Sequence, residues 1–178
     1  LTELPVAIGQ LSSLEKLVLS SNKLRTLPLE LSSLGRLKTL QLDENQLGPE
    51  LPADLFSGAV SGALEELDLS GNGLRELPTS VCGLGQLVRL VVPRNGLKAL
   101  PACLGALPKL QHVDAADNQI TGISAGLLAA ASLSELWLRG NPVDRLRLQQ
   151  TPGFDAFLER RRQRLDAKIG SNVVGSVN

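Results

Sequence analysis

The sequence predicts a right-handed α/β solenoid: a horseshoe arc with a short parallel β-sheet on its concave face and irregular, 3₁₀ or helical segments on its convex face. Two observations predict this fold class. Leucine supplies 39 of the 178 residues, whereas aromatic residues make up only 2% of the chain. The pattern L-x-x-L-x-L-x-x-N-x-L also recurs six times, and repetition at a period of about 20–50 residues is typical of solenoids.

The six copies of the pattern follow one another in register. They are LEKLVLSSNKL from Leu14, LKTLQLDENQL from Leu37, LEELDLSGNGL from Leu64, LVRLVVPRNGL from Leu87, LQHVDAADNQI from Leu110 and LSELWLRGNPV from Leu133. Their asparagines, here called the asparagine ladder, are Asn22, Asn45, Asn72, Asn95, Asn118 and Asn141. Successive ladder residues are 23 positions apart, except for one interval of 27 between the second and the third.

Each copy is expected to contain one short strand, and neighbouring copies are expected to pair in parallel. Alternation along the first strand turns Leu17 and Leu19 inward and leaves Lys16 and Val18 outward. The continuation L-P-x-x-L-x-x-L returns the chain along the convex side, where proline favours a 3₁₀ start because it fixes φ and donates no hydrogen bond.

The ladder asparagines are interpreted as structural residues. The turn after each strand leaves backbone groups that need a partner, and an asparagine side chain can bond to them. Replacing one by Leu or Ala is expected to leave buried backbone unpaired, at a cost of roughly 1–3 kcal/mol.

The repeat array is expected to span residues 1–150, with a partial repeat at 1–13 and six repeats from Leu14. The first residues have the pattern of the second half of a repeat, which predicts that the chain begins in mid-pattern. Stacked repeats bury each other's faces, so the ends of an array need covers.

A C-terminal cap helix is expected at residues 151–169, followed by a flexible tail at 170–178. Thr151 would be the N-cap and Pro152 the first helical residue. The apolar stripe of this helix would consist of Phe154, Phe157, Leu158 and Leu165.

Two features depart from the regular repeat. The long interval after Asn45 is interpreted as a surface bulge or, alternatively, as a convex contact for a partner through Phe56. Cys82 and Cys103 lie in consecutive convex segments and could approach each other, although two small thiols buried in the core are the preferred interpretation. Two cysteines and no N-x-S/T site favour a reducing compartment.

These motifs resemble the leucine-rich repeats of the intracellular type with 23 residues and the consensus LPxxLxxL, similar to the Ras-suppressor-like class. The resemblance covers roughly residues 1–145. The segment TPGFDAFLERRRQRLDAKIGSNV also resembles the C-terminal segment of small stand-alone cytoplasmic leucine-rich repeat proteins of plants and animals. The resemblance implies a cytoplasmic scaffold or regulator that binds proteins, in some relatives within small-GTPase signalling.

Several classes of function are excluded on composition. Equal numbers of basic and acidic residues (18 each) and the scarcity of aromatic residues argue against nucleic-acid binding. No apolar run is long enough for a transmembrane segment. His112 is the only histidine, and the one serine near it at an outward position is Ser134. We therefore expect no enzyme activity, no cofactor and no metal site.

The candidate binding surface is the concave face, where outward strand positions and the turns beyond them project. Its residues are Asp43, Glu44, Glu66, Asp68, Arg89, Arg94, His112, Asp114, Trp137 and Arg139. The first four form an acidic patch, whereas cationic groups gather around the only tryptophan. Tryptophan and arginine are enriched in binding hot spots, so Trp137 is predicted to anchor a partner. The alternative is that Trp137 packs near the cap.

The charge of the chain is divided unequally along its length. Residues 139–178 carry eight Lys and Arg against four Asp and Glu, a net charge of +4. The cluster Arg160–Arg164 is a candidate contact for an acidic partner or an anionic membrane surface. The alternative is that the cluster is the solvated side of the cap helix.

The sequence as a whole predicts a cytoplasmic module that recognises a partner protein of unknown identity. One alternative is a structural subunit of a large assembly. Another is the sensing part of a longer signalling protein.

Overall fold

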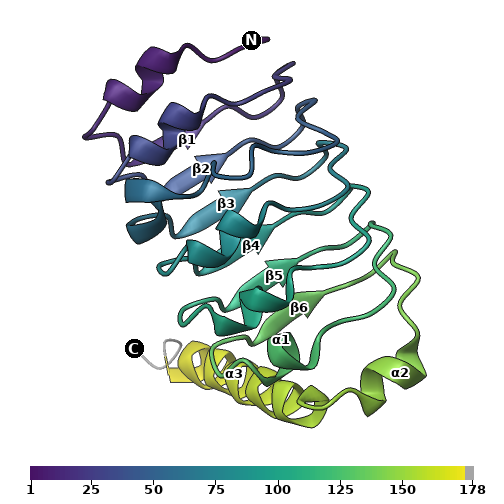
Figure 1. Cartoon of the computed structure of the whole chain (residues 1–178). Helices are drawn as coiled ribbons and strands as arrows, with labels where there is room; N and C mark the ends of the chain where they lie inside the picture. The colour runs from purple at the N-terminus through teal and green to yellow at the C-terminus, as the bar shows by residue number, and fades with distance from the viewer. Residues whose placement is uncertain (175–178) are drawn as a thin grey trace.

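The computed structural model describes the backbone of residues 1–174 and the side chains of residues 1–167. Over this range, six three-residue strands form one open parallel sheet in sequence order (Figure 1). The strands are β1 (Lys16–Val18), β2 (Thr39–Gln41), β3 (Glu66–Asp68), β4 (Arg89–Val91), β5 (His112–Asp114) and β6 (Glu135–Trp137). The predicted fold, a solenoid arc with a parallel sheet, is confirmed.

The register of the sheet aligns equivalent positions of every repeat. The central residues of the strands form one row: Leu17, Leu40, Leu67, Leu90, Val113 and Leu136. Four of these residues, Leu40 to Val113, are at most 2% exposed. The row therefore forms the sheet side of the core, as the period-two alternation predicts.

Short helical turns line the opposite side of the array (Figure 1). They are the 3₁₀ turns η1 (Val6–Gln10), η2 (Leu29–Ser33), η3 (Gly58–Gly62), η4 (Thr79–Gly83) and η5 (Ala102–Ala106), and the helix α1 (Ala125–Ala129). A proline directly precedes four of the 3₁₀ turns, with φ between −54° and −70°. This is the φ that the proline ring imposes, so the LP motif starts these four turns.

The long repeat holds an aromatic ring inside the core. Phe56 is only 1% exposed, and its neighbours Leu51 and Leu55 are buried with it. The extra residues give this coil room for a ring that the shorter coils lack. The interpretation of Phe56 as a convex contact for a partner is therefore wrong.

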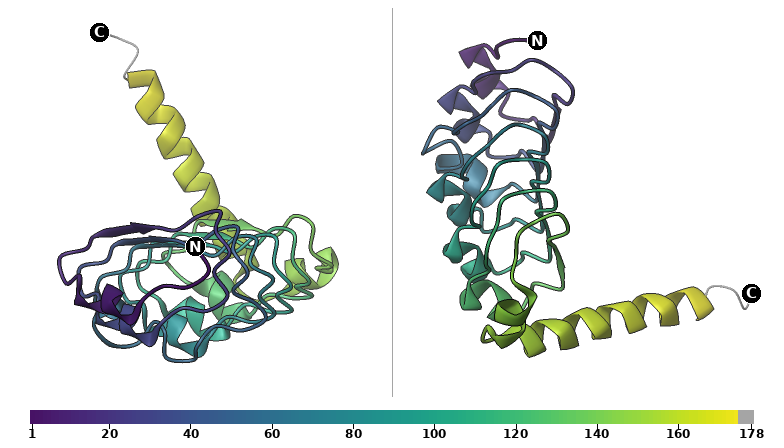
Figure 2. Two further views of the ribbon diagram at one scale, coloured as in Figure 1. Left: turned by 90° about the horizontal axis from the view of Figure 1, so that it is seen from above. Right: turned by 90° about the vertical axis from the view of Figure 1, so that its right-hand side faces the viewer.

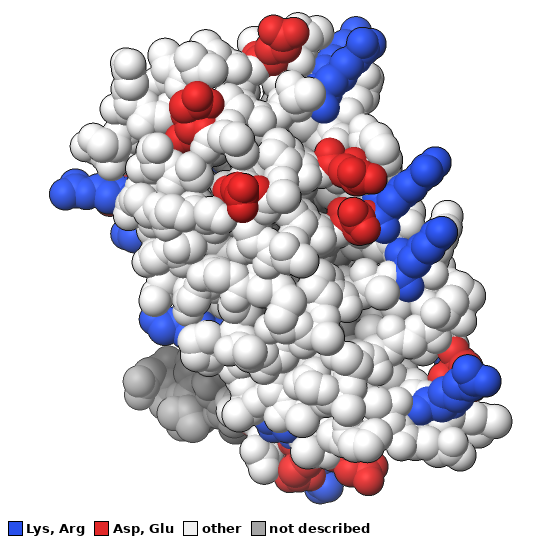
Figure 3. All heavy atoms as spheres, in the orientation of Figure 1, with Lys and Arg blue, Asp and Glu red and all other residues white. Residues whose placement is uncertain are grey.

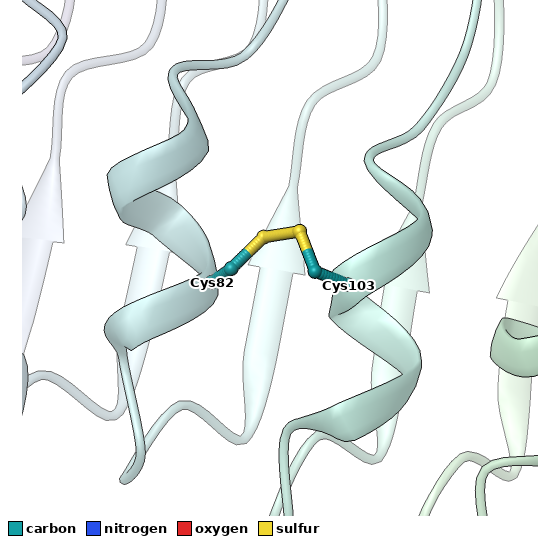
Figure 4. The surroundings of a disulfide bond; sticks show 2 residues. All are labelled: Cys82 and Cys103. Carbon is teal, nitrogen blue, oxygen red and sulfur yellow. A yellow bond between two sulfur atoms is a disulfide. The ribbon is translucent and has the colours of Figure 1, made fainter.

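The two cysteines form a disulfide between η4 and η5 on the convex side (Figure 4). Their α-carbons are 5.7 Å apart, because the two residues lie in the 3₁₀ turns of successive coils. Cys82 is half-buried and Cys103 is exposed. The interpretation of both residues as small thiols buried in the core is therefore wrong.

The C-terminal end contains two helices, α2 (Arg145–Gln150) and α3 (Phe154–Val174). Asp144 caps α2 by accepting hydrogen bonds from the backbone of Leu146 and Arg147. Thr151 ends α2 instead of capping α3, because its hydroxyl donates to the carbonyl of Arg147 at 2.8 Å.

Helix α3 is longer than predicted and covers the array with only part of its stripe. It continues through residues 170–174, where a flexible tail was expected, and residues 175–178 lie outside the described part. Phe157 is buried, whereas Leu158 and Leu165 are 42% and 50% exposed. Figure 2 shows α3 leaving the last coil at a steep angle and projecting beyond the array on the strand side.

Candidate functional site

The ladder asparagines join successive coils through the backbone. Asn118 Nδ2 donates to the carbonyl of Val92 in the preceding coil at 2.9 Å and to Ala115 in its own coil at 3.2 Å. Its Oδ1 accepts from the backbone N–H of Leu97 at 3.0 Å. The same three kinds of bond recur at Asn45, Asn72, Asn95 and Asn141. Asn22 bonds to carbonyls of its own coil.

The residue before each ladder asparagine adopts a left-handed conformation. These residues, here called the turn column, are Ser21, Glu44, Gly71, Arg94, Asp117 and Gly140, with φ between 52° and 75°. The backbone therefore turns in the same way after every strand. Glu44 and Arg94, predicted in separate acidic and basic groups, form an ion pair across the intervening coil.

The acidic patch is partly occupied by local hydrogen bonds. Asp43 accepts from the hydroxyl of Ser20, and Asp68 accepts from the backbone N–H and the hydroxyl of Ser70. Glu66 is exposed and lies opposite Arg89 in the register of β3 and β4. The predicted acidic and basic groups therefore meet at the middle of the sheet.

The side chain of His112 is buried, although the strand pattern predicts it among the outward residues of the concave face. It is 8% exposed, and its Nδ1 lies 2.8 Å from Glu135 Oε2. The other ring nitrogen, Nε2, is buried and has no hydrogen-bond partner in the described part of the chain. Glu135 Oε1 lies 3.3 Å from the guanidinium of Arg164 on α3. His112 is thus held between the sheet and the cap.

Trp137 projects from the last strand and is 51% exposed. Its ring makes an edge contact with the ring of His112, with the centroids 5.5 Å apart. Trp137 also lines two hollows that Arg161 of α3 shares, so the two sequence interpretations of Trp137 are not exclusive. The tryptophan lies near the cap and is still accessible to a partner.

The larger hollow has a volume of about 650 Å³ and opens at the corner between the sheet and α3. Asp114 and Asp117 line it on the β5 side, and Arg139 and Arg161 line it on the side of β6 and α3. The smaller hollow, about 130 Å³, lies between Trp137 and Leu165 of α3. We call these two hollows together the corner groove.

The arginines of α3 divide into two pairs. Arg160 donates to the carbonyls of Leu133 and Leu128, and burial lowers the pKa of its guanidinium. Arg164 donates to Gln111 Oε1 at 3.0 Å and to Ser134 Oγ at 2.6 Å. Arg161 and Arg162 are exposed. Half of the cluster therefore attaches α3 to the array. Neither sequence interpretation of the cluster, as a contact for a partner or membrane or as the solvated side of the cap helix, included this role.

Sequence reasoning missed Arg161 and Leu165 as neighbours of Trp137. Leu165 was assigned to the apolar stripe of the cap helix and Arg161 to the cluster Arg160–Arg164, because nothing in the repeat pattern relates residues 137 and 161. The spacing of four between Arg161 and Leu165 on a helix is a signal that they share one face, but the partner of that face depends on the angle of α3.

The described residues provide no arrangement suited to metal-dependent or triad chemistry. No cluster of three His, Cys, Asp or Glu side chains suitable for a metal occurs among them. Ser134 Oγ accepts from Arg164, and His112 Nδ1 bonds to Glu135.

None of the helices described is both long and apolar enough to cross a membrane. Figure 3 shows that Lys and Arg gather mainly along one edge of the face opposite the sheet.

The chain is similar in sequence and structure to proteins built from leucine-rich repeats. A family model described as Leucine Rich Repeat matches residues 13–34 and 63–84. The leucine-rich repeat ectodomain of the membrane receptor kinase GASSHO1/SCHENGEN3 from Arabidopsis thaliana is 32% identical, with a TM-score of 0.70 over 79% of this chain and 17% of that one. It was solved in complex with CASPARIAN STRIP INTEGRITY FACTOR 2.

Two further solved structures show the same similarity. The leucine-rich repeat domain of the type III effector XCV3220 (XopL) is 27% identical, with a TM-score of 0.69 over 78% of this chain and 48% of that one. The ectodomain of the Arabidopsis receptor kinase HAESA, in complex with an IDA peptide hormone, is 27% identical, with a TM-score of 0.69 over 79% and 24%.

The chain spans about half or less of the length of each of these three structures. No curated protein matches it. The 23-residue LPxxLxxL subtype and the resemblance of the C-terminal segment stay predictions. The family model, the similar structures and the stacked coils agree on the architecture. The chain is a leucine-rich repeat protein.

Proposed function

We propose that this chain is a protein-recognition module, acting as a scaffold or regulator, that binds a partner polypeptide on its concave face with Trp137 as the anchor. The observation that carries the proposal is the half-exposed indole at the edge of a hollow of about 650 Å³. Most other large apolar residues of the last three strands are buried or packed against the core. Exposed tryptophans beside arginines are typical of binding hot spots.

The similar structures support binding in general. Two of them are receptor ectodomains in complex with a named ligand, which is a peptide hormone in the case of HAESA. Each of these ligands is bound by the receptor named with it. For this chain, the two complexes support a polypeptide as the class of ligand.

The test compares two residues of the same strand column at opposite ends of the sheet. Trp137 on β6 and Val18 on β1 are both 51% exposed. A partner is identified by affinity capture and mass spectrometry, purified, and titrated against Trp137→Ala and Val18→Ala. We expect Trp137→Ala to raise the Kd at least about tenfold and Val18→Ala to change it little.

Each outcome of this test has a defined meaning. Circular dichroism must show that both variants fold. An unchanged Kd for Trp137→Ala contradicts the anchor, and a partner that never exchanges indicates a structural subunit instead of a regulator. The proposal includes no catalysis, because the only imidazole is buried against Glu135.

The compartment of the protein is a separate part of the proposal. A cytoplasmic location stays a prediction, and the Cys82–Cys103 disulfide is evidence against it, since disulfides persist mainly in oxidising compartments. Thiol counting on protein from its native source decides the point. Two reactive thiols support the cytoplasm, and none supports an oxidising compartment.

A further inference from the structure

One face of α3 forms a side wall of the binding surface in addition to covering the array. Arg161 and Leu165, one helical turn apart, both line hollows beside Trp137. The helix projects beyond the sheet on its strand side (Figure 2), and its 21 residues correspond to a length of about 31 Å. A segment that enters the concave face at its C-terminal end therefore contacts the sheet and α3 together.

Helix α3 is attached to the array by residues other than Arg161 and Leu165, which line the corner groove. Phe157 is buried in the core cluster, and Arg160 donates to two carbonyls of the last coil. Arg164 contacts Glu135, which bonds to His112. These contacts fix α3 and leave Arg161 unused by the attachment.

The same contacts position the anchor. Glu135 holds the ring of His112, and this ring packs edge-on against Trp137. Because Glu135 is itself contacted from α3, the attachment of the helix also orients the indole. Preorganised aromatic side chains bind with a smaller loss of entropy than mobile ones.

The charges of the corner groove are arranged on opposite sides. Asp114 and Asp117 lie on the β5 side, and the carboxylate of Asp114 accepts the backbone N–H of Ala116 at 3.0 Å. Arg139 and Arg161 lie on the other side, and in the described part of the chain neither forms an ion pair. Arg94 differs, since it pairs with Glu44.

We propose that the corner groove selects a partner segment in which a large apolar side chain lies beside one or two carboxylate side chains. The apolar side chain packs on Trp137 and Leu165. The carboxylates bind Arg139 and Arg161, since arginine forms paired, charge-assisted hydrogen bonds with carboxylates. The β5 side repels them, so the acidic group lies toward α3. This inference rests on the proposed function and names the chemistry of its partner.

The test is selection of peptides from a phage-displayed random library on the full chain. Selected peptides are synthesised with a fluorescent label, and their binding is followed by the fluorescence anisotropy of that label, because Trp137 is the only tryptophan of the chain and is itself replaced in one variant. We expect the selected sequences to be enriched in Asp or Glu next to Leu, Phe or Trp. Their Kd should rise when the salt concentration is raised, because ions screen exposed charge pairs.

Three arginine variants make the test specific to the groove. Arg139→Ala and Arg161→Ala should each raise the Kd about tenfold. Arg162→Ala is the matched control, because Arg162 is the exposed neighbour on α3 and lines neither hollow. It should change the Kd by less than about twofold.

The outcomes separate this inference from the proposed function. Peptides without acidic enrichment, or with a Kd unchanged by Arg139→Ala and Arg161→Ala, overturn the inference. If Trp137→Ala still abolishes their binding, the proposed function stands. If Trp137→Ala has no effect either, both fail. Sedimentation with phosphatidylserine vesicles that depends on Arg161, in the absence of any selected peptide, assigns the arginines to a membrane and also overturns the inference.

Discussion

The carboxylate of Glu44 lies over the α-carbon of Gly71, in the next coil, and reaches Arg94 in the coil beyond. A β-carbon added to Gly71 would lie 2.7 Å from Glu44 Oε1. Because Gly71 has no side chain, the carboxylate of Glu44 can extend across this coil and form an ion pair with Arg94. Two residues 50 positions apart are thereby linked.

Gly71→Ala should destabilise the protein by about 1–2 kcal/mol, because alanine is strained at a φ of +63°. Gly73→Ala is the matched control: its φ is +72°, but nothing lies within 4 Å of an added β-carbon. The difference between the free energies of unfolding of the two variants measures the contribution of the Glu44–Arg94 ion pair to stability. This contribution should be at most about 1 kcal/mol, because both side chains are exposed. A difference that does not shrink in high salt would contradict this explanation.

Asn118→Ala should lower the free energy of unfolding by about 1–3 kcal/mol, because the substitution leaves buried backbone groups of two coils without a partner. Asn22→Ala should cost less, since Asn22 is only half-buried and bonds to carbonyls of its own coil. Urea denaturation gives both values. Hydrogen exchange should then show the loss of protection centred on the coils around Asn118, and a uniform loss along the array would oppose a nearest-neighbour solenoid.

Replacing both cysteines by serine should lower the free energy of unfolding by about 3 kcal/mol, because the disulfide closes a loop between residues 21 positions apart. Reduction of the wild-type chain should reproduce this loss. Thermal unfolding with and without reductant measures it. Equal stability of the oxidised wild type and the double variant would show that the disulfide does not constrain the unfolded chain.

Arg160→Ala should loosen the attachment of α3, because the guanidinium donates to the carbonyls of Leu133 and Leu128. Hydrogen bonds from charged groups contribute roughly 1.5–3 kcal/mol. Arg162→Ala on the exposed side should have almost no effect, since its ion pair with Asp166 is long (4.0 Å) and solvated. Limited proteolysis of α3 compares the two variants, and equal cleavage rates would contradict the assigned role.

The ion pair between Glu15 and Lys38, 2.9 Å long, gives a pH prediction. The hydrogen bond from Lys38 lowers the pKa of Glu15 below 4.5 and raises that of Lys38 above 10.5. The stabilisation is therefore present between these values, and it is lost as the pH falls through the lowered pKa of Glu15 or rises through the raised pKa of Lys38.

Lys38→Met should return the pKa of Glu15 toward its ordinary value, and NMR titration of the carboxyl group measures the change. Arg36→Met is the control, since Arg36 makes the smallest contribution to the shift. A Glu15 titration that is the same in the wild type and in Lys38→Met would show that the pair does not form in solution.

The repeat positions could be predicted because a solenoid is a local structure. The inward row from Leu17 to Leu136 follows from alternation within three-residue strands, and its register follows from the period. One error occurred where the period is interrupted. Phe56 was assigned to the surface because the extra residues of its coil have no repeat to indicate their direction.

The candidate site could be predicted only in part. The strand pattern assigns Trp137 to the outward column, and the half-exposed indole agrees with that. The same pattern gave no reason to expect that His112, also outward, would be buried. Its burial comes from Trp137 and Glu135 on the neighbouring strand and from Arg164 on α3.

The sequence by itself determined the coil, the strand register and the outward columns, because these depend on contacts between residues one repeat apart. The tertiary structure alone decided the direction of α3, the bridge from Glu44 to Arg94 and the disulfide in place of two thiols. Each of these depends on how side chains of different coils, or of the cap and the array, meet in space. The repeat period specifies which residues of successive coils align. The contacts of individual side chains between coils, or between the cap and the array, depend on packing angles that no single repeat encodes.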